Sequence, residues 1–311
     1  MNDSRNMILA VALSVLVLLG WGLVTETWFP TSAPPTTKVE QGRTVPLPQP
    51  NADPAADSPA ATRDRAVVLG ETPRIRIETP RLAGSINLRG ARIDDLVLVT
   101  HRETIAADSP PVRLFSPAGA PGAYFGQFGW TGQGGSAAPG ADTVWQASGQ
   151  RLTPATPVTL SWNNGQGQIF QIILSVDDGY LFTAEQRVLN RGGGPVAVQP
   201  FALVSRVGAS HDIDSWTSHV GPVGVFNGAA NYDNNYSTVS EAGTITNQTG
   251  GGWLGFSDTY WLTAVIPDQG ETVEASFRHN RGTDAVQAGP AQAADDAADG
   301  RAEGQAVPPQ H

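Results

Sequence analysis

Short runs of alternating apolar and polar residues, separated by turn residues, recur between residues 65 and 282. Residues 158–162 alternate in this way and end at an Asn-Asn-Gly turn signal, while residues 169–176 are nearly all apolar and stop at Asp-Asp-Gly. Side chains on a strand point to opposite faces in turn, and almost no helical period lies between these runs. The pattern therefore predicts an all-β fold, with one large β-sandwich domain spanning residues 65–282.

One uninterrupted apolar run precedes this pattern, at residues 7–24, with 18 residues and no charge. As a helix it is about 27 Å long, close to the thickness of the hydrocarbon core of a bilayer. Trp21 and Trp28 lie near its far end, as expected at a membrane–water boundary, and no small-residue cleavage pattern follows directly. We expect an uncleaved transmembrane helix, with a cleaved signal peptide as the alternative. Arg5 then keeps residues 1–6 as a cytoplasmic stub, and the main domain is exported.

Two further segments have no apolar period. Prolines recur every few residues from residue 30 to residue 64, so residues 25–64 are predicted to be a disordered linker that gives the domain reach. Residues 283–311 contain no aromatic residue and only isolated valines as bulky aliphatic residues. We expect a disordered tail there.

Composition excludes several classes of function. The formal net charge is −10, which argues against nucleic-acid binding, because phosphates favour dense basic patches. The chain has 0 cysteines, so disulfides, thiolate nucleophiles and cysteine metal sites are all absent from the sequence. No Gly-x-Ser-x-Gly elbow or phosphate-binding loop occurs either.

Several motifs in order resemble those of YidC-type membrane protein insertases. The start of the chain has a short polar stub that ends in Arg5 and Asn6, just before the apolar run. The most specific match is a Gly-Gly-Trp strand that begins at Gly251, followed by an aromatic pair and an Ala-x-Ile-Pro ending that closes at Pro267. Weaker similarities lie at residues 86–91 and 189–190. The resemblance covers roughly residues 1–282.

This resemblance implies a fold, a location and partners. The exported domain of the family is a β super-sandwich similar to that of sugar mutarotases, in the periplasm, anchored in the bacterial inner membrane. Family members help nascent membrane proteins to insert and fold, alone or with the Sec translocon, and no cofactor is implied. Insertion in the family is performed by a later bundle of membrane helices. No second apolar run of bilayer length follows residue 24, and the match weakens abruptly at Gly282, so we interpret the end of the sequence as a truncation or frame change.

Polar residues between 211 and 219 form one candidate site. His211, Asp212, Asp214 and His219 place imidazoles and carboxylates close together in sequence, as a metal site or an acid–base pair requires. The regular spacing of such sites is missing, however, and an ordinary polar loop explains the stretch better. We therefore assign no metal, cofactor or catalytic residue.

Glu185 is the second candidate, in the middle of an expected strand. A mutarotase-like fold invites the pairing of Glu185 with a histidine on a sugar. A solvent-facing carboxylate paired with Arg187 is the simpler interpretation.

Aromatic residues near the Gly-Gly-Trp motif form the third candidate. Tyr260 and Phe256 are proposed as an interaction surface, whereas Trp253 and Trp261 are expected in the core. The leading hypothesis is thus a non-enzymatic insertase module that docks partners. A membrane-anchored protein that binds or modifies carbohydrates is the alternative, and a product without activity of its own is the third possibility.

Overall fold

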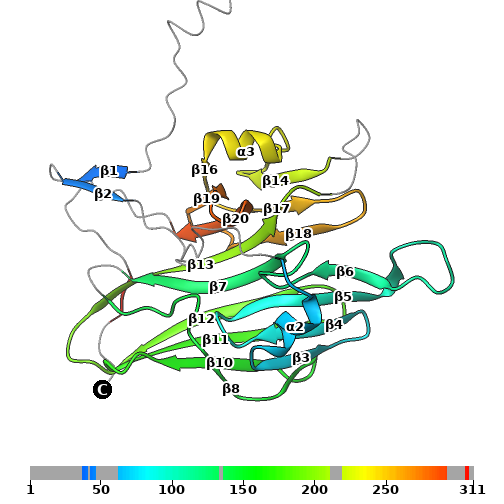
Figure 1. Ribbon diagram of the computed structural model, residues 1–311. Coiled ribbons are helices and arrows are strands. Elements are labelled where there is room, and N and C mark those ends of the chain that lie inside the picture. Colours follow the sequence, from blue (N-terminus) through cyan, green and yellow to red (C-terminus); the bar gives the residue numbers. More distant parts are fainter. Residues whose placement is uncertain are drawn as a thin grey trace, which may run out of the picture. The chain divides into compact units, whose positions relative to one another are not determined.

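The computed structural model describes residues 62–132, 136–210 and 219–292, together with the backbone of three short strands at 37–40, 43–46 and 305–307. Most of the described chain is β-structure, so the predicted all-β fold is confirmed (Figure 1). The chain divides into two compact units, residues 1–47 and residues 48–311. The first contributes only the antiparallel hairpin of β1 (Thr37–Glu40) and β2 (Arg43–Pro46) to the description.

The second unit is built on one 11-stranded sheet. Its strands follow the order β16 (Thr244–Thr249), β19 (Val273–Asn280), β20 (Ala285–Gln292), β13 (Val196–Val207), β7 (Tyr124–Gly132), β5 (Arg92–Arg102), β4 (Leu82–Asn87), β3 (Arg74–Glu78) and β9 (Arg151–Leu152). β6 (Pro111–Phe115) pairs with β5, and β21 (Gln305–Val307) pairs with β13. β13 is the longest of these strands, and it joins the two halves of the sheet.

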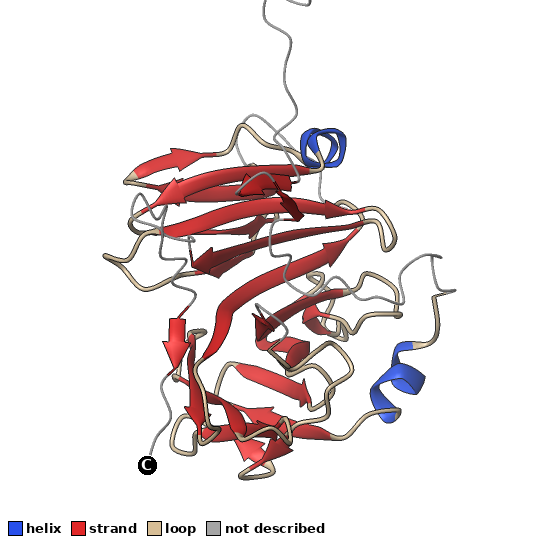
Figure 2. Ribbon diagram, turned by 90° about the vertical axis from the view of Figure 1, so that its left-hand side faces the viewer, coloured by secondary structure: helices blue, strands red, loops and turns tan. Residues whose placement is uncertain are grey.

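Two 4-stranded sheets complete the sandwich. One has the order β12 (Phe182–Asn190), β11 (Gln168–Val176), β10 (Val158–Asn163) and β8 (Gln146–Ala147). The other, called here the small sheet, has the order β15 (Ala229–Asn231), β14 (Gly221–Phe226), β17 (Gly252–Ser257) and β18 (Leu262–Val265). Figure 2 shows the strands stacked in these layers, with the two short helices at the periphery.

A single large core lies between the sheets. Ile77 of β3, Leu160 of β10, Phe256 of β17 and Phe277 of β19 all belong to it, and each is at most 1% exposed. Every second residue of β11 is buried, as a strand with one face in a core requires. Burial of each such side chain contributes about 1.5–3 kcal/mol, so the core accounts for the stability of a domain without disulfides.

Short helices cap two edges of the domain. Asp64 is the N-cap of α2 (Arg65–Gly70), and its carboxylate accepts from the backbone N–H of Ala66 at 2.8 Å. Arg65 then forms an ion pair with Asp95 of β5, which holds the helix against the long sheet. Asn235 caps α3 (Tyr236–Ala242) in the same way, by accepting from the N–H of Thr238 at 2.8 Å.

Several sequence predictions match individual strands. The alternating run at 158–162 is β10 and the apolar run at 169–176 is β11, each to within one residue. The Asn-Asn-Gly signal forms the turn between β10 and β11, where the side chain of Asn163 accepts from the N–H of Gly165 at 2.8 Å. Gly165 takes a φ of +75°, which a residue without Cβ adopts at little cost.

The predicted end of the domain at residue 282 is wrong. β20 (Ala285–Gln292) follows it and pairs with both β13 and β19 in the middle of the long sheet. The composition of this strand is rich in Ala, Gly and Gln, and that misled the sequence interpretation. Ala288 is fully buried because it faces Val204 and Phe277 in adjacent strands, where a small side chain suffices. The change of composition at residue 282 therefore gives no support to a frame change at that point.

The predicted linker at 25–64 includes the hairpin of β1 and β2, which the sequence interpretation missed. None of the helices in the described part of the chain is long and apolar enough to cross a membrane, and the expected transmembrane helix at 7–24 lies outside the described residues.

Candidate functional site

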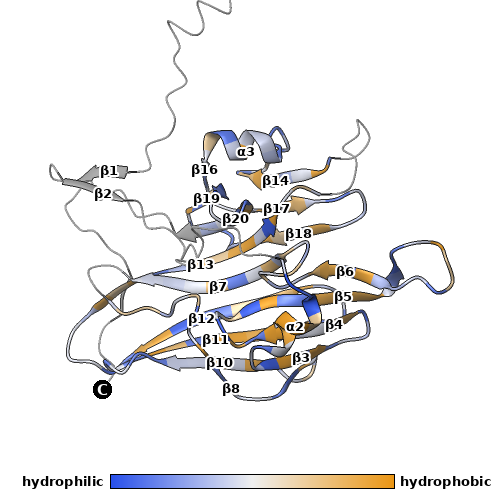
Figure 3. Cartoon of the chain, in the orientation of Figure 1, coloured by the Kyte–Doolittle hydropathy of each residue, from blue (hydrophilic) through white to orange (hydrophobic). Residues whose placement is uncertain are grey.

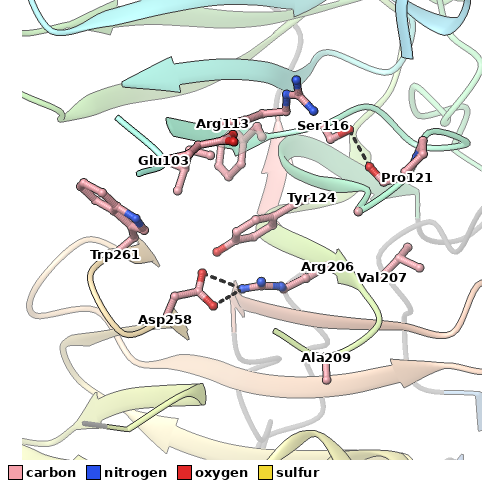
Figure 4. Close-up of a pocket in the computed structure, with 13 residues that line it drawn as sticks. Glu103, Arg113, Ser116, Pro121, Tyr124, Arg206, Val207, Ala209, Asp258 and Trp261 are labelled. Carbon is pink, nitrogen blue, oxygen red and sulfur yellow. Dashed lines mark hydrogen bonds and ion pairs between the residues drawn. The ribbon is translucent and has the colours of Figure 1, made fainter. Parts of the chain in front are cut away.

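A cavity of about 260 Å³ lies where four elements meet: β6, the start of β7, the end of β13 and the turn between β17 and β18. The side chains that define it are those of Arg113, Phe115, Tyr124, Arg206, Asp258 and Trp261 (Figure 4). Glu103, just after β5, and Arg113, on β6, lie at its rim and are exposed. The cavity thus brings together residues that are far apart in the sequence.

Strand register places Arg206 over Tyr124. The two residues are directly opposite in the antiparallel pairing of β13 with β7, so their side chains lie on the same face of the sheet. The guanidinium carbon of Arg206 lies 5.0 Å from the centroid of the Tyr124 ring. This is a cation–π geometry, which stabilises a partly desolvated arginine.

Asp258 neutralises Arg206. Nη1 of Arg206 donates to both carboxylate oxygens of Asp258, at 2.8 Å each, and the side chains are only 14% and 13% exposed. The turn that carries Asp258 is closed by its backbone N–H, which donates to the carbonyl of Trp261 at 2.7 Å. Burial lowers the pKa of Arg206, but the neighbouring Tyr236 and Asp258 outweigh that effect and the net shift is upward. The arginine is therefore charged and paired at every physiological pH.

Two phenols border this ion pair. Burial is the largest influence on both: it raises the pKa of Tyr124 far above its usual value and that of Tyr236 to about 12. The hydroxyl oxygens of Tyr124, Tyr236 and Thr263 are buried; the neighbouring Thr263 lowers the pKa of Tyr124 and Arg206 lowers that of Tyr236, each against the larger effect of burial. In Figure 4 the Tyr124 hydroxyl points toward the side of the cavity that holds Asp258 and Trp261.

Stacked aromatic rings connect the cavity to the core. The ring of Phe256 is stacked on Tyr236, with centroids 6.0 Å apart and an interplanar angle of 12°, and it meets Tyr124 edge-on at 6.1 Å. Trp261 contacts His101 edge-on at 5.0 Å. These contacts hold the small sheet against the long sheet next to the ion pair.

The arrangement suits contact with an uncharged group better than acid–base chemistry. The carboxylates at the cavity are Glu103 and Asp258, Asp258 is engaged by Arg206, and none of the described lining residues is a histidine. A histidine–carboxylate contact does occur elsewhere, between Nε2 of His279 and Asp284 at 3.0 Å, where Asp284 is 80% exposed. The described lining of this cavity therefore lacks the histidine–carboxylate pair that the sugar-enzyme alternative requires.

Glu185 lies on β12 as a solvent-facing carboxylate. It accepts from Nε of Arg187 at 2.5 Å, and about half of each side chain is exposed. This confirms the simpler of the two interpretations of Glu185. His219 precedes β14, with its Nε2 3.0 Å from the carbonyl of Pro222.

The rest of the predicted polar site, His211, Asp212 and Asp214, lies outside the described residues. No group of histidine, aspartate and glutamate side chains suited to a metal ion occurs among the residues that the structure describes.

The prediction for the aromatic residues was partly wrong. Tyr260 is 81% exposed, but Phe256 is 1% exposed and cannot form a surface, because its ring lies between the sheets. Trp261 packs against the core as expected. Trp253 instead faces away from it, since it neighbours the buried Leu254 in β17 and successive side chains alternate.

Arg206 and Asp258 were missed by the sequence analysis. They are 52 residues apart, and although Asp258 lies inside the Gly-Gly-Trp motif that closes at Pro267, nothing in that motif indicates a partner for it. The available signal was a single arginine near the end of the otherwise mostly apolar β13, since a charge in such a run needs a partner when it is buried.

The fold defines the class of this protein as a large all-β sandwich domain. Its cavity is lined by aromatic side chains, and the charge of Arg206 in it is neutralised by Asp258. The sequence matches the family described as the YidC periplasmic domain over residues 74–304. The chain therefore belongs to the YidC family of membrane protein insertases and contains its periplasmic domain.

Curated relatives agree with this assignment. The chain is 47% identical over 280 residues to a protein from Zymomonas mobilis named membrane protein insertase YidC, across 89% of this chain and 47% of that protein. A protein of the same name from Bradyrhizobium diazoefficiens is 39% identical over 307 residues, across 90% of this chain and 48% of that protein. One from Methylobacterium nodulans is 38% identical over 299 residues, across 89% and 48%. The chain thus spans about half the length of these relatives.

Proposed function

We propose that this chain is the anchor and periplasmic docking part of a YidC-type insertase of the bacterial inner membrane. Residues 1–6 are then a cytoplasmic stub, residues 7–24 cross the membrane once, and residues 25–64 link the crossing to the sandwich. The sandwich extends past the predicted limit of 282 to at least the end of β20. Support for the location comes from the name of the matching family and from the apolar run of 18 residues.

The proposed role is contact with nascent membrane proteins and with components of the Sec translocon, without catalysis. The observation that carries it is the family membership of the whole sandwich together with the exposed aromatic side chain of Tyr260. The relatives carry the word insertase in their names, but this chain covers about half of each. We assign the insertion step to the part of those proteins that lies beyond the match, and docking to the sandwich.

Site-specific photocrosslinking tests this role. A photoreactive phenylalanine replaces Tyr260 in one version of the full chain and Tyr180 in a matched control, because both tyrosines are exposed. Radiolabelled inner-membrane proteins are synthesised in vitro in the presence of membranes that carry each version. We expect crosslinks to these clients from position 260 and few from position 180. Equal crosslinking at the two positions, or adducts with soluble proteins alone, contradicts the proposal.

A depletion experiment tests whether insertion requires the part of the relatives that lies beyond the match. In cells depleted of their own insertase, this chain by itself should not restore growth, because the proposed docking role does not open a path through lipid. Restored growth overturns that assignment.

A further inference from the structure

β18 is the last strand of the small sheet. It pairs with β17 on one side, from Leu262 opposite Ser257 to Val265 opposite Leu254, and no strand in the described residues pairs with its other side. A strand in this position leaves a row of backbone N–H and C=O groups that can pair with another chain. Residues 260–267, which include β18, contain no charged side chain.

Other strands at the margins of the sheets are protected. β12 carries the exposed pair Glu185 and Arg187, and β9 carries Arg151, which lies 3.1 Å from Glu78. β8 has two residues and β15 has three, which limits pairing by length. β16 has no charge, but its exposed side chains are polar. Charges and short lengths are the usual means by which proteins block unwanted strand pairing, and β18 has no charge of this kind.

The face of the small sheet that points away from the core is apolar. Trp253 is opposite Val225 and Gly255 is opposite Val223 in the pairing of β14 with β17, while Gly255 is also opposite Ala264 of β18. Side chains directly opposite one another lie on the same face. This set, called here the outer face, consists of Val223, Val225, Trp253, Leu262, Ala264 and Ile266.

None of the outer-face residues belongs to the core cluster, whereas Leu254 and Phe256, on the opposite face of β17, are 1% exposed. Leu262 is 52% and Ile266 57% exposed. Figure 3 shows hydrophobic segments along β14, β17 and β18. Contiguous apolar surface beside an open strand edge is typical of an interaction site.

We propose that β18 binds an extended, uncharged, apolar segment of another polypeptide as an added strand. The main chain of the segment pairs with the open side of β18, and every second side chain extends the outer face beside Leu262 and Ala264. Residues 260–267 carry no charge, so a charged segment placed on them would lose hydration without gaining a counter-charge, and an uncharged segment is favoured. This inference rests on the proposed docking function and names the chemistry of its partner.

A second copy of the chain is the less favourable occupant. β18 has four residues, so pairing two such edges buries far less than the roughly 1,200–2,000 Å² of a stable interface. Two chains that each carry −10 also repel one another. A flexible segment avoids both problems, because it can follow the edge and also cover the outer face.

The test measures binding of a labelled eight-residue peptide, rich in valine and threonine and without charge, to the full chain in lipid nanodiscs. Fluorescence anisotropy follows binding, and empty nanodiscs give the blank. The same peptide with an N-methyl group on every amide has no N–H to donate along either edge, so we expect its affinity to fall by about tenfold or more. Leu262→Lys should weaken binding of the unmodified peptide by a similar factor, because a lysine protects an edge.

Leu181→Lys is the matched control, because Leu181 is 54% exposed and precedes β12 on a different sheet. It should leave binding unchanged, and the urea midpoints of both variants should equal that of the parent chain. Equal binding of the N-methylated peptide overturns strand addition. A concentration-dependent dimer that Leu262→Lys abolishes, with no peptide binding, also overturns it in favour of a second copy.

The two proposals fail separately. If photocrosslinking from position 260 captures membrane proteins but the peptide is not bound through its main chain, the docking function stands and strand addition falls. If the peptide binds along β18 but no client is crosslinked, the edge is a binding site and the proposed insertase role is lost.

Discussion

Nη1 of Arg206 lies 2.8 Å from both carboxylate oxygens of Asp258, and this contact joins the end of β13 to the turn between β17 and β18. Both side chains are largely buried, so neither charge has much access to water. The pair therefore connects the long sheet to the small sheet at the cavity. Removal of one partner leaves the other as an uncompensated charge.

Asp258→Asn should lower the free energy of unfolding by about 3 kcal/mol, because the guanidinium of Arg206 then stays buried without a counter-charge. Urea denaturation followed by tryptophan fluorescence measures this. Glu185→Gln is the control: its partner Arg187 is about half exposed, and the cost should stay below about 1 kcal/mol. Equal costs for the two substitutions would show that the Arg206–Asp258 pair is no more desolvated than a surface pair.

Stability should fall at alkaline pH through the two buried phenols. The pKa of Tyr236 is raised to about 12 in the folded protein and that of Tyr124 is raised further, both mainly by burial. Unfolding returns both to a pKa of about 10, so above that pH the unfolded chain binds fewer protons and gains stability relative to the folded one. Each phenol should then lower the free energy of unfolding by about 1.4 kcal/mol per pH unit, until the pH reaches the pKa of that phenol in the folded protein.

Urea titrations at pH 8, 10 and 11 measure this slope, and absorbance at 295 nm follows phenolate formation directly. A Tyr236→Phe variant should lose part of the slope above pH 10. An unchanged slope in that variant would assign the alkaline loss of stability to other groups.

Phe256→Ala should destabilise the domain by about 4 kcal/mol, since it removes a ring packed between Tyr124 and Tyr236 and leaves a void. Tyr260→Ala, four positions further along, should change stability by less than about 0.5 kcal/mol because that side chain is in solvent. Thermal unfolding by circular dichroism compares the two. A small effect of Phe256→Ala would reinstate Phe256 as a surface residue.

Gly255→Ala should disrupt the pairing of β17 with β18. A Cβ at this position would lie 1.8 Å from the carbonyl oxygen of Thr263, which is backbone and cannot rotate away. We expect a cost of more than about 2 kcal/mol, measured by urea denaturation. Gly193→Ala is the control, because nothing lies within 4 Å of a Cβ built at Gly193. If both substitutions are tolerated, the two strands can separate locally without loss of the fold.

Sequence periodicity predicted the strands that have a bulky apolar face. β10 and β11 alternate or run apolar over six and nine residues, and turn residues mark their ends. β20 escaped prediction because it is built from Ala, Gly and Gln, which carry little apolar signal. Its place in the sheet is decided by neighbours: a Cβ on Gly289 would lie 2.1 Å from the carbonyl oxygen of Ala202 in β13, so only glycine permits this close approach.

The candidate site was predicted less well for a related reason. Tyr260 was proposed as a surface residue and is exposed, and Glu185 pairs with Arg187 two positions along the same strand, because both outcomes depend on residues that are close in the sequence. Phe256 was misplaced, since alternation gives two faces but does not say which one meets another sheet. Arg206 and Asp258 were overlooked, because their contact depends on how β13 and the β17–β18 turn meet in space.

The sequence by itself determined the all-β class, the family and the position of several strands, since these follow from a period of two residues, from turn chemistry and from local motifs. Tertiary structure alone decided which face of each strand is buried, which strands lie at the edges of their sheets, and how Arg206 meets Asp258. The physical reason is the distance along the sequence between the residues that interact. Side-chain alternation is set between neighbours in the chain, whereas burial, strand order and ion pairing depend on residues that only the packed sheets bring together.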